Sequence, residues 1–228
     1  MSKKLITMKK ILAVCMVSVG FSMVAKAQSF SIGPNAGYGT TWLDNFKDKK
    51  YKSAGNVGLS FIYSTKSSFG IGADVKYSFE GGKRQYATTV PGVTATEEAS
   101  LNYLRVPIKA MWFFGSYGQR VRPKITLGPS FGFLVGGKTE VSYSNTTIAP
   151  KVTESKDNWD DFDLGVTGSV GLNYRLVTNT WLTADISYLH GLTDAREDSK
   201  RSVSENYLPG TNYKNRNVQL NIGVNFGL

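Results

Sequence analysis

The feature that most constrains this chain is a strict alternation of apolar residues with small polar ones. Residues 218–228 show it most clearly, because every second residue there is apolar and each residue between is Gln, Asn or Gly. Side chains of a β-strand point alternately to its two faces, so this segment predicts a strand with one apolar face and one small polar face. We expect the apolar face, with Phe226 and Leu228, to lie against something outside the chain, and lipid is the leading candidate.

Seven further segments carry the same two-residue period, and they cover residues 30–42, 55–63, 69–80, 101–114, 123–135, 162–174 and 181–192. In segment 69–80 one face is apolar throughout, and the other carries Asp74, Lys76 and Glu80. A strand in a soluble core could not hold these three charges on one face without partners. Adjacent Tyr103 and Leu104 predict a β-bulge near the start of segment 101–114.

The connections between these segments alternate in length. Those after the second, fourth and sixth segments are short, at residues 64–68, 115–122 and 175–180. Those after the first, third, fifth and seventh are long and polar, at residues 43–54, 81–100, 136–161 and 193–217. This asymmetry predicts an all-β fold, a transmembrane up-and-down antiparallel β-barrel of eight strands with short periplasmic turns and long extracellular loops.

Aromatic residues gather near both ends of the expected strands. The loop end has Trp42, Phe79 and Tyr188, and the turn end has Phe69, Trp112, Phe114, Tyr174 and Phe226. Two such belts suit an apolar band about 25 Å tall. The alternative is a secreted soluble barrel or a β-sandwich, whose outward polar faces would be rich in long charged residues. Here those faces are rich in Gly, Ser, Asn and Thr, which favours the membrane barrel.

The N-terminus has the composition of a secretory signal. Lys3, Lys4, Lys9 and Lys10 precede an apolar run at residues 11–24, and Ala-Lys-Ala at residues 25–27 is a small-x-small cleavage site. The apolar run is shorter than the roughly 20 residues that a spanning helix needs. We therefore expect residues 1–27 to be a cleaved signal peptide and residues 28–228 to be one barrel domain, integral to the bacterial outer membrane.

Removal of the signal changes the charge balance. The remaining chain has 22 basic and 17 acidic residues, a net charge of +5 instead of the +10 of the whole sequence. Basic residues are scattered among acidic ones in runs of at most two, which argues against a nucleic-acid partner. The remaining chain has no Cys and one His, so disulfides are excluded, and we expect neither a metal site nor a cofactor.

Several short motifs lie along the expected strands: Tyr103 with residues 104–108 (LRVPI), residues 127–130 (LGPS), 133–138 (FLVGGK), 163–165 (DLG) and 188–193 (YLHGLT). In these motifs the chain resembles the outer-membrane β-barrel domain of the PorT-like family, which is typical of the Bacteroidetes. The resemblance covers nearly all of residues 28–228. It implies the barrel fold and no established catalytic residues, and the namesake of the family is linked to a secretion apparatus.

The inward faces of the expected strands carry nine charged residues: Asp74, Lys76, Glu80, Arg105, Lys109, Lys124, Asp163, Arg175 and Asp185. An eight-stranded barrel is just wide enough for side chains to fill it, and buried charges need partners. We therefore expect these residues to pair across the lumen and plug it. Segments 69–80 and 101–114 are neighbours, so the first expected pairs join Asp74 and Glu80 to Arg105 and Lys109. The alternative is a narrow ion or solute path.

His190, the single histidine, raises a catalytic alternative, because some outer-membrane barrels modify lipid A with a His, a Ser and an acid at the outer rim. Ser187 and Asp185 are close in sequence, but the alternation places them on the opposite face from His190. We expect His190 to belong to the aromatic belt and the protein not to be an enzyme. Gly70 and Gly72 fit the same alternation, and no helix follows them, so they do not indicate a nucleotide or calcium site.

The long loops carry mixed charges at Glu97-Glu98, Arg196-Glu197-Asp198 and Lys200-Arg201. We expect these groups to be solvated, in positions where divalent cations or lipopolysaccharide phosphates could bind. Three functions of different class follow: a structural or adhesive barrel that presents four loops, a small pore or part of an export machine, and a lipid-modifying enzyme. Eight strands favour the first. The expected partners are outer-membrane lipid and lipopolysaccharide, with an envelope or secretion protein as a further partner, and the barrel is expected to be a monomer.

Overall fold

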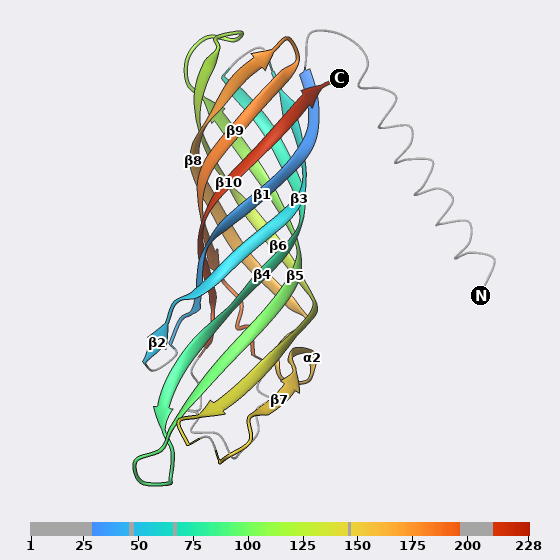
Figure 1. Ribbon diagram of the computed structural model, residues 1–228. Helices are drawn as coiled ribbons and strands as arrows, with labels where there is room; N and C mark the ends of the chain where they lie inside the picture. The colour runs from blue at the N-terminus through green and yellow to red at the C-terminus, as the bar shows by residue number, and fades with distance from the viewer. Residues whose placement is uncertain (1–28, 46–47, 66–67, 146, 197–211) are drawn as a thin grey trace, which may run out of the picture.

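In the computed structural model, strands that lie side by side along the chain also pair in space, and the sheet closes on itself (Figure 1). The structure describes residues 29–45, 48–65, 68–145, 147–196 and 212–228, so the expected signal peptide lies outside the described residues. Eight long strands form the wall: β1 Ser29–Leu43, β3 Lys52–Ser64, β4 Phe69–Ala87, β5 Thr94–Phe113, β6 Val121–Tyr143, β8 Phe162–Val177, β9 Thr180–Gly191 and β10 Asn215–Gly227.

Three short elements lie at the loop end of the barrel, at the bottom of Figure 1. They are β2 Lys49–Lys50, which pairs with β4, β7 Lys151–Glu154, which pairs with β6, and the one-turn helix α2 Ser155–Asn158. No helix among the described residues is long and apolar enough to cross a membrane.

The first and last strands close the barrel. β10 lies antiparallel to β1 with pairs such as Tyr38 with Leu220 and Ile32 with Phe226, and on its other side β10 pairs with β9. Every long strand therefore has a neighbour on both sides, which leaves no open edge in the wall. The prediction of a closed antiparallel barrel of eight strands is confirmed.

The two faces of the wall are inverted relative to a soluble protein. Large apolar side chains such as Leu127, Val170 and Ile222 are more than half exposed on the outside, whereas Asn35, Ser60 and Asn221 are buried inside. A contiguous apolar exterior of this size marks a surface that lies against another apolar phase. The aromatic residues expected at the two belts lie on this exterior, and at the loop end the rings of Trp42 and Tyr188 are 6.5 Å apart.

The prediction of a loop at residues 81–100 is wrong for most of this segment. β4 and β5 continue as a hairpin to Ala87 and from Thr94, so only residues 88–93 form the tip. The reason is the charge pattern: Lys83 lies opposite Glu98 and Arg84 opposite Glu97. Cross-strand pairs of opposite charge stabilise a hairpin, so a polar stretch here forms strand instead of loop.

A β-bulge lies where the sequence predicts one. Asn102 pairs with Gly136 and Tyr103 pairs with Leu134, so Val135 is an extra residue between them. The adjacent pair Tyr103-Leu104 predicts the extra residue in β5, but the structure places it in β6. Its effect is to exchange the two faces of β6, because Leu134 points inward before the bulge and the odd-numbered Thr139 points inward after it.

β1 and β10 approach each other so closely at Gly33 that a larger residue should not fit there. A Cβ atom added at Gly33 would lie 1.7 Å from the carbonyl oxygen of Val224, whereas one added at Gly136 would meet nothing within 4 Å. We expect Gly33→Ala to lower the free energy of unfolding by about 1–3 kcal/mol through overpacking. Gly136→Ala, the matched control, should change it by less than about 0.5 kcal/mol. Urea unfolding of the barrel in lipid vesicles measures both, and equal midpoints would contradict the close approach.

Candidate functional site

The lumen gathers eight of the nine charged residues that the sequence selects. Four are acidic and four are basic, so their formal charges balance: Asp74, Glu80, Asp163 and Asp185 with Lys76, Arg105, Lys109 and Lys124. They form two groups at different heights. We call the group nearer the loop end the lumen triad, formed by Glu80, Arg105 and Asp163.

The lumen triad joins three strands through one guanidinium. Arg105 of β5 donates to Glu80 of β4 at 2.6 Å from both Nε and Nη2, and Nη2 also donates to Asp163 of β8 at 2.8 Å. The three residues are at most 5% exposed. The N–H donors of a guanidinium lie in one plane and in fixed directions, so Arg105 can donate to two carboxylates at once. The ammonium group of a lysine has no such planar set of donors.

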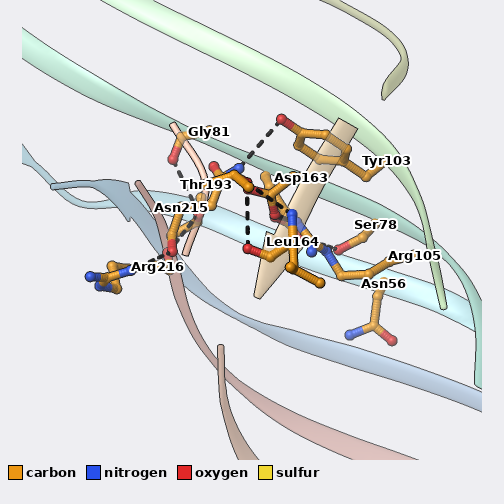
Figure 2. Close-up of polar contacts among 12 residues, drawn as sticks. Asn56, Ser78, Gly81, Tyr103, Arg105, Asp163, Leu164, Thr193, Asn215 and Arg216 are labelled. Carbon is orange, nitrogen blue, oxygen red and sulfur yellow. Dashed lines mark hydrogen bonds and ion pairs between the residues drawn. The ribbon is translucent and has the colours of Figure 1, made fainter. Parts of the chain in front are cut away.

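Neighbouring side chains hold the triad in place. Figure 2 shows Arg105 directed at Asp163, with Thr193 beside them and Tyr103 reaching towards Asn215. The Thr193 hydroxyl donates to Asp163 at 3.3 Å, and the Asn215 amide donates to the Tyr103 hydroxyl at 3.3 Å. The guanidinium of Arg105 also lies 5.0 Å from the ring centre of Tyr103. The Ser78 hydroxyl donates to Glu80 at 2.7 Å, so each member of the triad has a second contact.

The second group lies nearer the middle of the wall. Asp74 accepts a hydrogen bond from Lys109 at 2.7 Å and lies 3.1 Å from the Nζ atom of Lys76. Across the lumen, Lys124 and Asp185 form an ion pair of 3.1 Å. Both groups follow from the alternation, because β4 and β5 are neighbours and their inward residues meet. The first expected pairs, Glu80 with Arg105 and Asp74 with Lys109, are brought together.

Arg175 does not join these groups, so its assignment to the charge network is wrong. It lies at the turn end, where the pairing of β8 with β9 shifts register between Arg175 and Val177. Its guanidinium lies 5.9 Å from the ring centre of Trp181, and among the described residues it forms no ion pair. Arg175 still pairs in the unshifted register, opposite Trp181, but it lies at the end of β8 and borders a cavity at the turn end, so its position along the barrel axis separates it from the other charges.

Apolar side chains close the lumen on either side of the charges. Towards the turn end, Ile62, Met111 and Phe113 form a cluster that we call the turn-end plug. Towards the loop end lies the loop-end cap, formed by Leu43, Ala99, Leu101, Tyr103, Leu134, Trp159, Ala195 and Tyr213. Between them, two cavities of about 50 and 40 Å³ border the charged side chains, which is room for only a few water molecules.

Trp159 of the loop-end cap comes from a segment that the sequence predicts as loop. It follows α2, is fully buried and donates from its indole Nε1 to Thr139 at 2.9 Å. The guanidinium of Arg196 lies 5.4 Å from its ring centre. A tryptophan within a long polar stretch is the sequence signal that could have indicated this anchor.

Some charges expected to be solvated are buried instead. Glu97 is 2% exposed and accepts a hydrogen bond from Arg84 at 2.7 Å, and Arg196 is 3% exposed. The expectation of solvated loop positions is therefore wrong for these two residues, because Glu97 shares its face with buried Ala95, Ala99 and Leu101 on the extended β5. Residues 197–201 of the same expected group lie outside the described residues.

Glu98, on the outer face of the same hairpin, stays partly exposed. It lies 3.2 Å from Lys83 and 3.5 Å from Lys52. Burial tends to raise the pKa of its carboxyl, but the hydrogen bond from Lys83 and the charges of Lys52 and Lys83 outweigh burial and lower that pKa below its usual value. Glu98 therefore stays ionised throughout the neutral range.

His190 lies on the outer face of β9. It is exposed, and its Nδ1 is 3.5 Å from the hydroxyl of Tyr188, whereas Asp185 pairs with Lys124 in the lumen and Ser187 contacts Asn221 there. The three residues thus do not converge. Within the described ranges, no group of three or more His, Cys, Asp or Glu side chains is placed to hold a metal ion.

The role of charge in the lumen triad can be tested by substitution. Arg105→Met leaves Glu80 and Asp163 buried together without their cation, and we expect it to cost about 3–5 kcal/mol of unfolding free energy. The triple variant E80Q/R105M/D163N removes all three charges and should cost less than Arg105→Met alone, because no buried charge is left without a partner. Urea unfolding in lipid vesicles compares them, and a triple variant less stable than R105M would contradict a charge-based role.

The chain is similar to several solved structures of outer-membrane proteins. The match to Neisserial surface protein A spans 88% of this chain and 99% of the other, at 13% sequence identity and a TM-score of 0.48. A major outer membrane protein from Thermus thermophilus covers 89% and 100% at 13% identity, with a TM-score of 0.49. Outer Membrane Protein W of E. coli covers 90% and 100% at 12% identity, with a TM-score of 0.44. No curated protein matches the sequence.

A family assignment comes from the sequence itself and agrees with the closed wall, the apolar exterior and the charged lumen. Residues 26–197, which include β1 to β9, match the family model described as "Outer membrane protein beta-barrel domain". The match covers most of the chain. The protein is therefore a member of the outer membrane protein beta-barrel domain family.

Proposed function

We propose that this protein is a closed, non-conducting outer-membrane barrel that acts through its loop end as a structural or binding protein. The observation that carries the proposal is the lumen triad, in which Arg105 holds Glu80 and Asp163 from two other strands in the barrel interior. A passing ion would have to displace the bidentate ion pair of Arg105 with Glu80. It would also lose its water of hydration in a narrow interior, which costs free energy.

The alternative of a small pore requires closure to be lost at three levels. The turn-end plug, the lumen triad and the loop-end cap follow one another along the barrel. The first is apolar, and in the second Arg105 already binds both carboxylates, so neither level offers carboxylates that are free to bind a passing ion. The third is built around Trp159, which a hydrogen bond to Thr139 holds in place.

The loop end offers a surface suited to anionic groups of lipopolysaccharide. Lys49 and Lys50 of β2 lie opposite Arg84 and Lys83 of β4. Arg84 is buried against Glu97, whereas Lys83, 3.2 Å from Glu98, and Lys49, 3.7 Å from Asp44, belong to partly exposed ion pairs. The patch lies directly beyond the aromatic belt, where the rings of Trp42 and Tyr51 are 5.4 Å apart. We name Lys49, Lys50 and Lys83 the basic patch. Lysines just outside an apolar band attract anionic head groups by about 1 kcal/mol each.

The remaining assignments belong to the same proposal. We infer that the short turns face the periplasm, the loops face outward and the barrel acts as a monomer in lipid, without catalytic chemistry. The resemblance to the PorT-like family supports a second candidate, a component of a secretion apparatus. Recovery of a stoichiometric secretion partner with a tagged chain from native membranes would favour that candidate. Altered lipid A in a strain without the gene would instead favour an enzyme.

Conductance in planar bilayers tests the closed lumen. We expect the intact barrel to give no steady openings, because three separate levels close it. Single substitutions at each level, Leu101→Ser, Arg105→Ser and Met111→Ser, should leave it closed, and the triple variant should show small openings. Glu98→Gln, on the outer face of the hairpin, is the matched control. Steady large openings of the intact protein would contradict the proposal.

Lipopolysaccharide binding tests the basic patch. We expect K49Q/K50Q/K83Q to weaken binding of purified lipopolysaccharide at least tenfold, since about 1 kcal/mol is lost for each lysine. The control K138Q/K151Q/K156Q removes the same charge from β6, β7 and α2 and should stay within about twofold. Added salt should reduce the difference by screening. Co-elution of fluorescent lipopolysaccharide with the barrel in zwitterionic detergent gives the measurement, and equal losses in both variants would contradict a localised site.

A further inference from the structure

A small cavity lies in the lumen between the lumen triad and the second charged group. Arg105 of the triad and Lys76 of the second group both line it, and its volume is about 40 Å³. The rest of its wall is mostly polar and comes from seven of the eight long strands, all except β1. None of the described residues that line it is acidic. The cavity is therefore a polar space that two cations border from the two charged groups.

Four buried polar atoms of side chains that border this cavity have no hydrogen-bond partner in the part of the chain that the structure describes. They are Arg105 Nη1, Gln219 Nε2, Asn56 Oδ1 and Ser130 Oγ. Each of the four residues is at most 6% exposed. Buried polar groups in proteins almost always have a partner, so four unsatisfied atoms around one cavity indicate a bound ligand.

The other polar atoms of these side chains are already engaged, which fixes the four atoms in place. Nε and Nη2 of Arg105 donate to the carboxylates of the lumen triad, so Nη1 is left. Nδ2 of Asn56 donates to Gln219 Oε1 at 2.6 Å and to Asn221 Oδ1 at 2.9 Å, which leaves Asn56 Oδ1 and Gln219 Nε2. The cavity thus offers two donors, one acceptor and one hydroxyl that can act as either.

These atoms call for a ligand that is small, neutral and able both to donate and to accept hydrogen bonds. An ion would bring an uncompensated charge into a lumen whose acids and bases already balance, and burial of such a charge is costly. Water meets these demands, because a buried water molecule needs about 10–15 Å³ and two to four polar partners. A volume of about 40 Å³ therefore has room for roughly three water molecules.

We propose that this cavity, which we call the lumen water site, binds roughly three ordered water molecules. They join Arg105 of β5 to Ser130 of β6, Gln219 of β10 and Asn56 of β3. In the wall β5 pairs with β4 and β6, so the water molecules also connect it to strands that the sheet does not place beside it. The site does not depend on the function proposed above, because it requires these four atoms and not a closed lumen.

X-ray radiolysis of the full barrel in lipid nanodiscs, with the added oxygen located by mass spectrometry, tests the lumen water site. Radiolysis makes hydroxyl radicals from water in place, so a buried side chain is modified where ordered water lies beside it. Leu189 lines the cavity and is 3% exposed, whereas Leu101 is fully buried in the loop-end cap. We expect Leu189 to be modified at least about tenfold faster than Leu101.

A variant that fills the cavity gives a second measurement. Ser130→Val removes one of the four polar atoms and adds a methyl group, so we expect it to slow the modification of Leu189 at least about threefold. The matched control is Ser169→Val, because Ser169 borders the other lumen cavity and bonds Thr126 there at 2.7 Å. That variant should stay within about twofold of the unchanged protein. The comparison of Leu189 with Leu101 needs no variant, so the test stands even if S130V does not fold.

The outcomes separate this site from the closed lumen. Lack of modification at Leu189, or equal losses in S130V and S169V, would overturn the lumen water site and leave the closed barrel untouched. Equal modification of Leu189 and Leu101 would indicate bulk water along the lumen, which contradicts both the ordered site and the closed barrel. Exchange of chloride for gluconate in the buffer should not change the rate at Leu189. A change would indicate an anion in the cavity and would overturn the assignment to water.

Discussion

The structure depends on one constraint, which is that a backbone amide or carbonyl in hydrocarbon must find its hydrogen-bond partner within the protein. An open sheet leaves one row of such groups at each edge, and a barrel leaves none. Here the pairing of β1 with β10 satisfies the last two edges over the length of both strands. Closure then dictates the rest, because a closed wall of eight strands has a narrow interior and an exterior that must dissolve in lipid.

The interior solves a second problem that closure creates. Every second side chain of each strand points into the barrel. If these inward side chains were all apolar, the inner and outer faces of the wall would be alike. Polar and charged residues inside fix which face is which, because a one-residue slip in register would bring charges to the lipid. The balanced set of four acids and four bases makes this arrangement tolerable in energy, since each charge meets an opposite charge on another position of the wall.

Most of the barrel could be predicted from the sequence, because its period of two is a local property. That period predicts the eight strands and which face of each strand points inward. It also predicts that the charged residues of β4 meet those of β5. What lies outside the membrane follows different rules. The outer half of the β4–β5 hairpin and the buried pair Arg84 and Glu97 look like loop in sequence, because the same charged residues occur in solvated loops. Trp159 and Arg196 meet through tertiary contacts that no local pattern encodes.

The continuation of β4 and β5 beyond the wall gives the molecule reach. From Glu80, which sits in the lumen triad, to Ala87 at the end of β4, the strand rises by roughly 20 Å at about 3.3 Å per residue, before its tilt is counted. Ion pairs join Arg84 to Glu97 and Lys83 to Glu98 across the hairpin, so it extends beyond the wall as two paired strands. In the orientation proposed above, with the loops facing outward, a particle that approaches the cell would meet residues 88–93 at the tip of this hairpin before it came near the lipid surface.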